Sequence, residues 1–160
     1  MGCIAARNQM VPNLALDTSL SNYPVCVFSV ESQMSQDMNK ELSVLKKDIF
    51  EKVSNLNIFR SIQFARDCEK AEGCLLVVVS ISEIKKVSGV KRFFLGVFAG
   101  RAMMKADITF IDAATQETIG SYTITGESGG SGMSGGTGDA IRKTSQAIVE
   151  IIQKNYRKWR

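Results

Sequence analysis

The sequence contains no histidine in 160 residues. Histidine is the commonest general base and the commonest metal ligand in proteins, so its absence removes Ser-His-Asp and Cys-His nucleophile systems and argues against a zinc site. No apolar run approaches the roughly 20 residues that a membrane-spanning helix needs. The sequence therefore predicts a protein that is not an enzyme, has no cofactor or metal, and does not span a membrane.

The composition is that of an ordinary soluble protein, with 44% hydrophobic and 22% charged residues. The chain is long enough for one core and too short for two domains. We expect a single domain over 22–160, preceded over 1–21 by a tether without helical or strand periodicity.

Hydrophobic periodicity predicts an α+β domain with the element order β-α-β-β-β-β-α. The predicted strands and helices are strands over 23–31, 58–65 and 75 to about 86, a β-hairpin over 101–128, and amphipathic helices over 38–56 and from Thr137 onward. We expect a mainly antiparallel sheet with both helices packed on its apolar face.

The hairpin is the segment on which the predicted architecture depends. Its first strand alternates strictly, which places five apolar residues on one face: Ala102, Met104, Ala106, Ile108 and Phe110. The turn is expected over 113–117, and Tyr122 and Ile124 share a face of the return strand. This pattern predicts one buried and one solvated face.

The four cysteines form no CxxC pair. Cys26 falls in an apolar strand, where a free thiol is usually an inert core residue. Cys68 and Cys74 bracket a short loop between two predicted strands, so the geometry allows a disulfide between them in an oxidising compartment.

The N-terminal Met-Gly-Cys has three interpretations. Cys3 is the lipidated residue of a bacterial lipoprotein with Gly2 ending a signal peptide, or Gly2 is myristoylated and Cys3 palmitoylated, or the triplet has no role. The second fits less well, because Ala6 stands where serine or threonine is expected.

Two further segments are candidate interfaces. The run over 93–102 carries Phe93, Phe94 and Phe98 and two glycines four residues apart, which fits either a strand or loop with bulges or an apolar surface for a neighbouring subunit or a membrane. Residues 141–160 contain six basic residues and one acidic residue. This segment therefore has a net charge of +5, while the rest of the chain has a net charge of −1, which together give the +4 of the whole chain. Arg157, Lys158 and Arg160 fit either a solvated helix end or a surface for an acidic partner or phospholipid headgroups, and the scarcity of aromatics disfavours nucleic acid.

Residues 126–138 hold seven glycines, a density typical of a flexible loop. Because the loop leads into a helix, its backbone amides also allow a phosphate cradle. This gives an alternative function, a domain that binds a small anionic ligand or nucleotide through the glycine-rich loop and the last helix.

The ordered series FFLGVFAGRA, KADITFIDAATQETIGSYTITGES, a Gly/Ser tract and the helix GDAIRKTSQAIVEII resembles a family of bacterial envelope lipoproteins, domain of unknown function 4410. The resemblance covers 75–152, with Gln116 where members often have glycine. It implies no catalytic residues. It implies an exported, periplasm-facing domain anchored to a membrane through Cys3, which binds other envelope proteins as a structural or accessory subunit of an oligomer or hetero-complex. Fold analogy suggests an outer-membrane secretion complex as the assembly.

Overall fold

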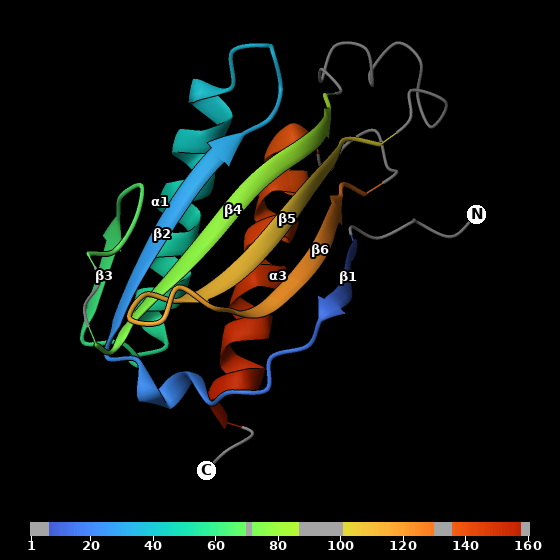
Figure 1. Ribbon diagram of the computed structural model, residues 1–160. Helices are drawn as coiled ribbons and strands as arrows, with labels where there is room; N and C mark the ends of the chain where they lie inside the picture. The colour runs from blue at the N-terminus through green and yellow to red at the C-terminus, as the bar shows by residue number, and fades with distance from the viewer. Residues whose placement is uncertain (1–6, 70–71, 87–100, 130–135, 158–160) are drawn as a thin grey trace, which may run out of the picture.

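A computed structural model describes residues 7–69, 72–86, 101–129 and 136–157, which form a single α+β domain (Figure 1). The elements in chain order are β1 Arg7–Leu14, the 3-10 helix η1 Leu20–Asn22, β2 Val25–Ser32, α1 Asn39–Asn55, β3 Ser61–Phe64, β4 Cys74–Lys85, β5 Met103–Asp112, β6 Thr118–Glu127 and α3 Thr137–Arg157. The predicted fold class and both helices are confirmed, and the hairpin turn lies between β5 and β6 as expected.

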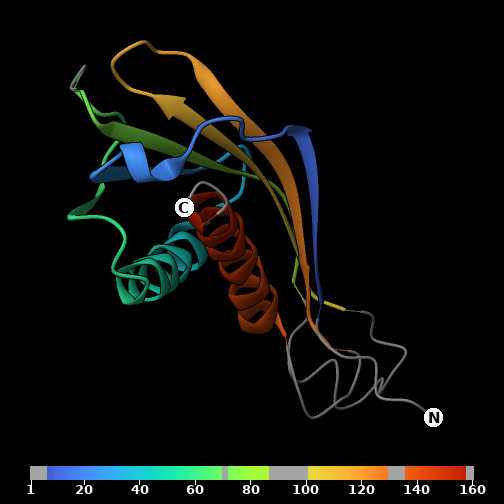
Figure 2. The same cartoon turned by 90° about the horizontal axis from the view of Figure 1, so that it is seen from below.

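The six strands form one sheet in the order β1-β6-β5-β4-β2-β3. The pairings on the β1 side, from β1 through β4, are antiparallel, whereas β2 pairs in parallel with both β4 and β3, so the sheet is mixed. Both helices lie on the same side of the sheet, and the strands at the β1 edge curl toward the helix layer (Figure 2). The opposite side of the sheet is left without a helix in the described part of the chain.

The core lies between the sheet and the two helices. The five residues predicted to share the buried face of the first hairpin strand are all fully buried, which confirms the predicted facing. From the helix side, α1 contributes Leu45, Ile49 and Val53, which recur at helical spacing and are fully buried.

Helix α3 approaches β6 closely at Gly126. A Cβ atom at this position would lie 2.5 Å from the carbonyl oxygen of Ala140 and 2.5 Å from the hydroxyl oxygen of Thr144. Because real contacts of this kind are longer, only glycine lets the helix backbone pack at this distance.

The prediction of an unstructured tether over 1–21 is wrong for residues 7–14. These residues form β1, which pairs antiparallel with β6 and places Met10 opposite Ile124 on the core side. Beyond the strand, Leu16 and Leu20 are buried in the same core. Apolar side chains are sparse in this segment and Pro12 interrupts it, which hides the strand signal, but an edge strand tolerates proline because its outer side needs no ladder donor.

Candidate interaction site

A cleft of about 920 Å³ lies where the curled β1 edge of the sheet faces the C-terminal half of α3. The sheet side of the cleft is lined by Met10, Pro12, Ala15, Leu16 and Tyr122, and the helix side by Glu150, Ile151, Gln153, Lys154 and Asn155. The inner wall is therefore largely apolar, and the charged side chains come from the helix.

The wall of the cleft is fixed by contacts around Leu16. The hydroxyl oxygen of Tyr122 accepts a hydrogen bond of 3.1 Å from the backbone N–H of Leu16, and the Tyr122 ring packs edge-on against Phe110 with centroids 6.0 Å apart. At Gly120, an added Cβ would lie 2.6 Å from Cγ of Leu16. The segment that leaves β1 is thus held against β6 rather than free in solvent.

The charged and amide side chains of the cleft come from α3. Glu150 and Lys154 are one helical turn apart on α3, and the side-chain amide of Asn155 donates to the carbonyl oxygen of Ile151 at 2.8 Å. Among residues 7–69, 72–86, 101–129 and 136–157, no group of three or more Cys, Asp and Glu is placed to hold a metal ion. The arrangement supports an apolar contact surface with a polar rim.

The edge strand β1 carries apolar side chains on both of its faces, beside the exposed polar residues Gln9 and Asn13. Met10 turns inward, while Val11 and Leu14 remain 46% and 49% exposed. Along its outer edge, β1 has no neighbouring strand in the described part of the chain. Soluble proteins protect such an edge with charge, proline or a bulge, and β1 has Pro12 and a bulge between Pro12 and Leu14, so it is the exposed apolar side chains that indicate a contact surface.

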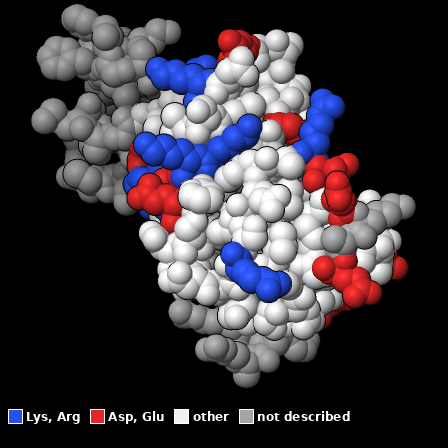
Figure 3. Space-filling view, turned by 90° about the vertical axis from the view of Figure 1, so that its left-hand side faces the viewer, with Lys and Arg blue, Asp and Glu red and all other residues white. Residues whose placement is uncertain are grey.

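A second groove, of about 370 Å³, lies at the opposite edge of the sheet between β2, β3 and α1. The ring of Phe64 stacks on Phe28 with centroids 5.6 Å apart and lies 6.4 Å from the ring of Phe50, which is 48% exposed. Two cations, Lys46 and Arg66, and one carboxylate, Glu31, also line the groove. Seen from this side, the molecule has a broad uncharged surface crossed by lysine and arginine side chains, with acidic side chains toward its margins (Figure 3).

A family model described as "Domain of unknown function (DUF4410)" matches residues 9–132. The chain belongs to this family. The match begins inside β1, so the strand that lines the cleft is part of the DUF4410 domain. No curated protein matches the chain.

The DUF4410 domain has the same fold as solved structures that are distant in sequence. One is described as a PelC dodecamer from Paraburkholderia phytofirmans, with a TM-score of 0.60 and 12% identity over 91% of this chain and 97% of that chain. Another is a protein from Xanthomonas campestris assigned to DUF330, with a TM-score of 0.53 and 7% identity over 97% of this chain and 93% of that chain. At these identities the likeness concerns the fold, which is shared over nearly the full length.

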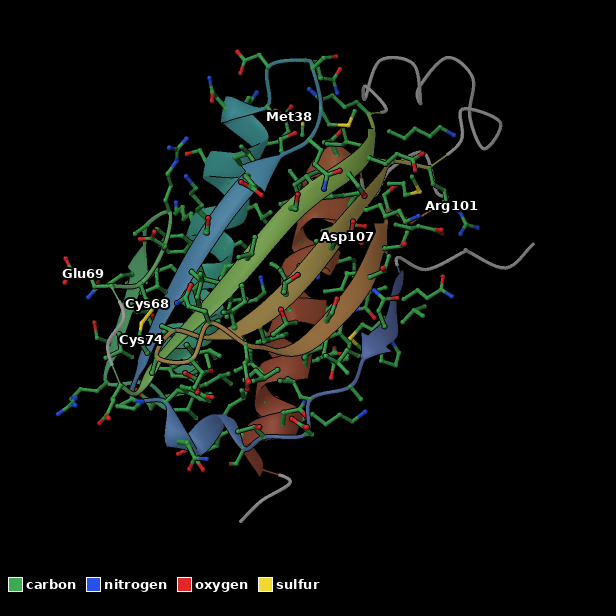
Figure 4. All side chains as sticks on the ribbon, in the orientation of Figure 1. Met38, Cys68, Glu69, Cys74, Arg101 and Asp107 are labelled. Atoms are coloured by element: carbon green, nitrogen blue, oxygen red, sulfur yellow. A yellow bond between two sulfur atoms is a disulfide. The ribbon has the colours of Figure 1, made fainter. Side chains whose placement is uncertain are left out.

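Among the candidate site residues from the sequence, Cys68 and Cys74 lie together. Their sulfur atoms are joined in a disulfide that ties the loop after β3 to the first residue of β4 (Figure 4). Cys26 is a free thiol buried beneath the sheet, and burial raises its pKa. Its inertness follows from this burial, because the reactive species is the thiolate.

The other candidate residues are not brought into a described site. Cys3, Phe93, Phe94, Phe98, Lys158 and Arg160 lie outside the described residues, and Arg157 is the last residue of α3. None of the described helices is long and apolar enough to cross a membrane. Sequence reasoning missed the β1 edge, whose one visible signal was the apolar pair Val11 and Leu14 beside Met10.

The beginning of α3 does not favour the anionic-ligand alternative. Asp139 lies in the first turn, where its carboxylate accepts the backbone N–H of Gly129 at 3.2 Å and pairs with Arg142. A carboxylate already interacts favourably with this end of the helix dipole, so a second anion there would meet a like charge. The central part of the glycine-rich loop, 130–135, lies outside the described residues.

Proposed function

We propose that this DUF4410 domain is a non-enzymatic, self-assembling subunit of a bacterial envelope complex. The observation that carries the proposal is the β1 edge. There a strand whose outer edge has no described neighbour exposes Val11 and Leu14 on one face and borders a largely apolar cleft on the other. A strand with these properties is stabilised by a protein partner rather than by water.

The shared fold supports self-assembly as the form of that contact. The PelC structure, which matches along 97% of its length, is described as a dodecamer. Repeated copies of one fold assemble when each presents surfaces that its neighbours can cover. The domain is therefore proposed to form a closed ring of identical subunits, and other envelope proteins bind to the ring.

The cellular address is part of the same proposal. A disulfide between Cys68 and Cys74 suits an oxidising compartment such as the periplasm. Cys3 carries the proposed lipid anchor, consistent with the resemblance to envelope lipoproteins. The domain then faces the periplasm from a membrane surface, as an accessory or structural subunit that binds other proteins.

The experiment expresses the gene with its upstream region in a bacterial host and separates membrane, periplasmic and cytosolic fractions. The proposal expects the wild-type protein in the membrane fraction, a Cys3 peptide whose mass includes acyl chains, and release into the periplasmic fraction for Cys3→Ser. A cytosolic protein without an acyl chain contradicts the proposed address. Monomers after detergent extraction contradict the proposed assembly, so the two parts fail separately.

A further inference from the structure

We infer that copies of this chain join head to tail, with the β1 edge of one copy seated on the Phe50 groove of the next. The Phe50 groove is the one bordered by Phe50 and lined by Phe28, Ser29, Val30, Glu31, Lys46, Phe64, Ala65 and Arg66. The inference rests on the proposed self-assembly and names the two surfaces that would make it.

The two surfaces lie at opposite ends of the sheet. In the strand order β1-β6-β5-β4-β2-β3, β1 is one edge, and the groove lies beside β2 and β3 at the other. Among the described residues, the large apolar side chains that remain exposed are Val11 and Leu14 on β1 and Val44 and Phe50 on α1. Phe50 is the one that packs toward the β3 edge, beside Phe64.

The separation of these surfaces determines the type of contact. In a two-fold dimer, the same patch on both subunits forms the contact. When two different patches on opposite sides of the subunit interact, one patch of each copy binds the other patch of the next copy. Such heterologous contacts repeat and close into a ring when the rotation between neighbours allows it. This geometry is compatible with the proposed ring and incompatible with an isologous dimer as the basic unit.

The backbone at both surfaces also suits strand addition. On the groove side, β3 pairs with β2 only from Val25 to Phe28, and the last contact is the N–H of Ala65 bonded to the carbonyl oxygen of Phe28 at 3.1 Å. Strand β2 continues to Ser32, and beyond Phe28 no described strand pairs with this side of it, next to Val30 and the groove. The outer edge of β1, which no described strand pairs, offers backbone groups on either side of Pro12, which itself has no N–H to donate.

The surfaces differ enough in chemistry to be complementary. The groove has the half-buried ring of Phe64, stacked on the fully buried Phe28, and is lined by two cations, Lys46 and Arg66, and one carboxylate, Glu31. The chain that follows β1 carries the exposed carboxylate of Asp17 close behind Leu14 and Ala15. Val11 and Leu14 would cover the accessible rings of Phe64 and Phe50 while Asp17 meets Lys46 and Arg66, a pattern that favours one orientation of docking.

The test uses the full chain and one substitution on each surface, Val11→Glu and Phe50→Glu. Each introduces a charge at an exposed position, so the fold should persist, which circular dichroism and thermal unfolding check. Leu14→Glu and Lys46→Glu serve as second variants should either first variant misfold. Ala114→Glu is the matched control, because it makes a comparable change at an exposed residue of the β5–β6 turn, away from both surfaces.

Analytical ultracentrifugation then measures the size of each variant alone and of an equimolar mixture. The inference expects wild type and Ala114→Glu to assemble, and Val11→Glu and Phe50→Glu to be monomers when alone. In the mixture, the intact groove of the first variant accepts the intact β1 edge of the second, so the expected product is a dimer and nothing larger.

The alternative outcomes are separate. Assembly that survives both substitutions overturns the inference and leaves the proposed self-assembly standing. A mixture that stays monomeric, or that regains the wild-type size, also overturns it, because neither follows from one β1 edge meeting one groove. A monomeric wild-type protein overturns the proposed assembly itself.

Discussion

The hydroxyl of Tyr23 donates a hydrogen bond of 2.9 Å to the carboxylate of Asp112. The second oxygen of this carboxylate accepts the backbone N–H groups of Ala114 and Thr115 at 2.9 and 3.2 Å. Asp112 therefore holds the β5–β6 turn in place and connects it to the chain that enters β2. The Tyr23 hydrogen bond is the largest influence lowering the pKa of Asp112, and burial is the largest influence raising the pKa of Tyr23.

Asp112→Asn should destabilise the domain at neutral pH and much less in acid. Because the folded pKa of Asp112 is lowered, its stabilisation is fully present above the unfolded value of about 3.9 and is lost as pH falls through the lower folded pKa. Hydrogen bonds to a charged group contribute about 1.5–3 kcal/mol, so we expect a loss of this order near pH 7. Urea unfolding near pH 7 and about pH 2.5 measures the loss in unfolding free energy at each pH. Tyr23→Phe is the second substitution in a double-mutant cycle. Equal losses at both pH values would contradict this role.

Two glycine substitutions should act in opposite directions. In Gly126→Ala, the new methyl group meets Ala140 and Thr144 at 2.5 Å and must push α3 away from β6, an overpacking that costs about 1–3 kcal/mol. Gly138 lies in the first turn of α3 with nothing within 4 Å of an added Cβ. Gly138→Ala should stabilise by about 0.4–1 kcal/mol through helix propensity and a less flexible unfolded chain. Thermal unfolding of the two variants and the wild type measures both changes in stability. A Gly126→Ala protein as stable as wild type would disprove the close packing.

Removal of residues 1–14 separates a structural strand from a tether. The deletion exposes the edge of β6 and removes Met10 from the core, so we expect a loss of at least about 2 kcal/mol in unfolding free energy. Deletion of residues 1–6 alone is the control and should change little. An unfolding curve unaffected by the longer deletion would mean that β1 contributes no stability.

The disulfide and the free thiol should respond differently to reagents. Closing the short loop between Cys68 and Cys74 contributes about 2 kcal/mol by the chain-entropy estimate, so reduction should lower the melting temperature. Cys26 is fully buried, so an alkylating reagent should modify it only after unfolding. Peptide mass mapping after alkylation, with and without reductant, shows whether Cys68 and Cys74 are bonded and whether Cys26 has been modified. Rapid labelling of Cys26 in the native protein would be inconsistent with its position.

The sequence predicted the elements with strong periodicity. Examples are the alternation from Ala102 to Phe110 and the helical spacing of Leu45, Ile49 and Val53. Each pattern can be read within one segment, because burial of one face of a strand or helix requires apolar residues at regular spacing. The parallel pairing of β2 with β3 and β4 was missed, because neighbours in a sheet depend on how the chain crosses over rather than on any one segment.

The candidate site was harder to predict than the fold. Strand β1 has few apolar residues and a proline, and its identity as a strand depends on the edge that β6 offers it. The cleft joins residues near Met10 to residues near Ile151, which lie far apart in sequence and have no shared motif. Cysteine spacing, by contrast, identified the pair that the structure joins, because a short loop between two strands limits where its ends can go.

The mass of the full chain under native conditions tests the central claim most directly. Native mass spectrometry of the purified, oxidised protein should give a single species whose mass is a whole-number multiple of the protomer, larger than a dimer, as a closed ring requires. If the measured mass is that of one protomer at every concentration, including those at which weak contacts form, the claim that another copy covers the β1 edge is contradicted.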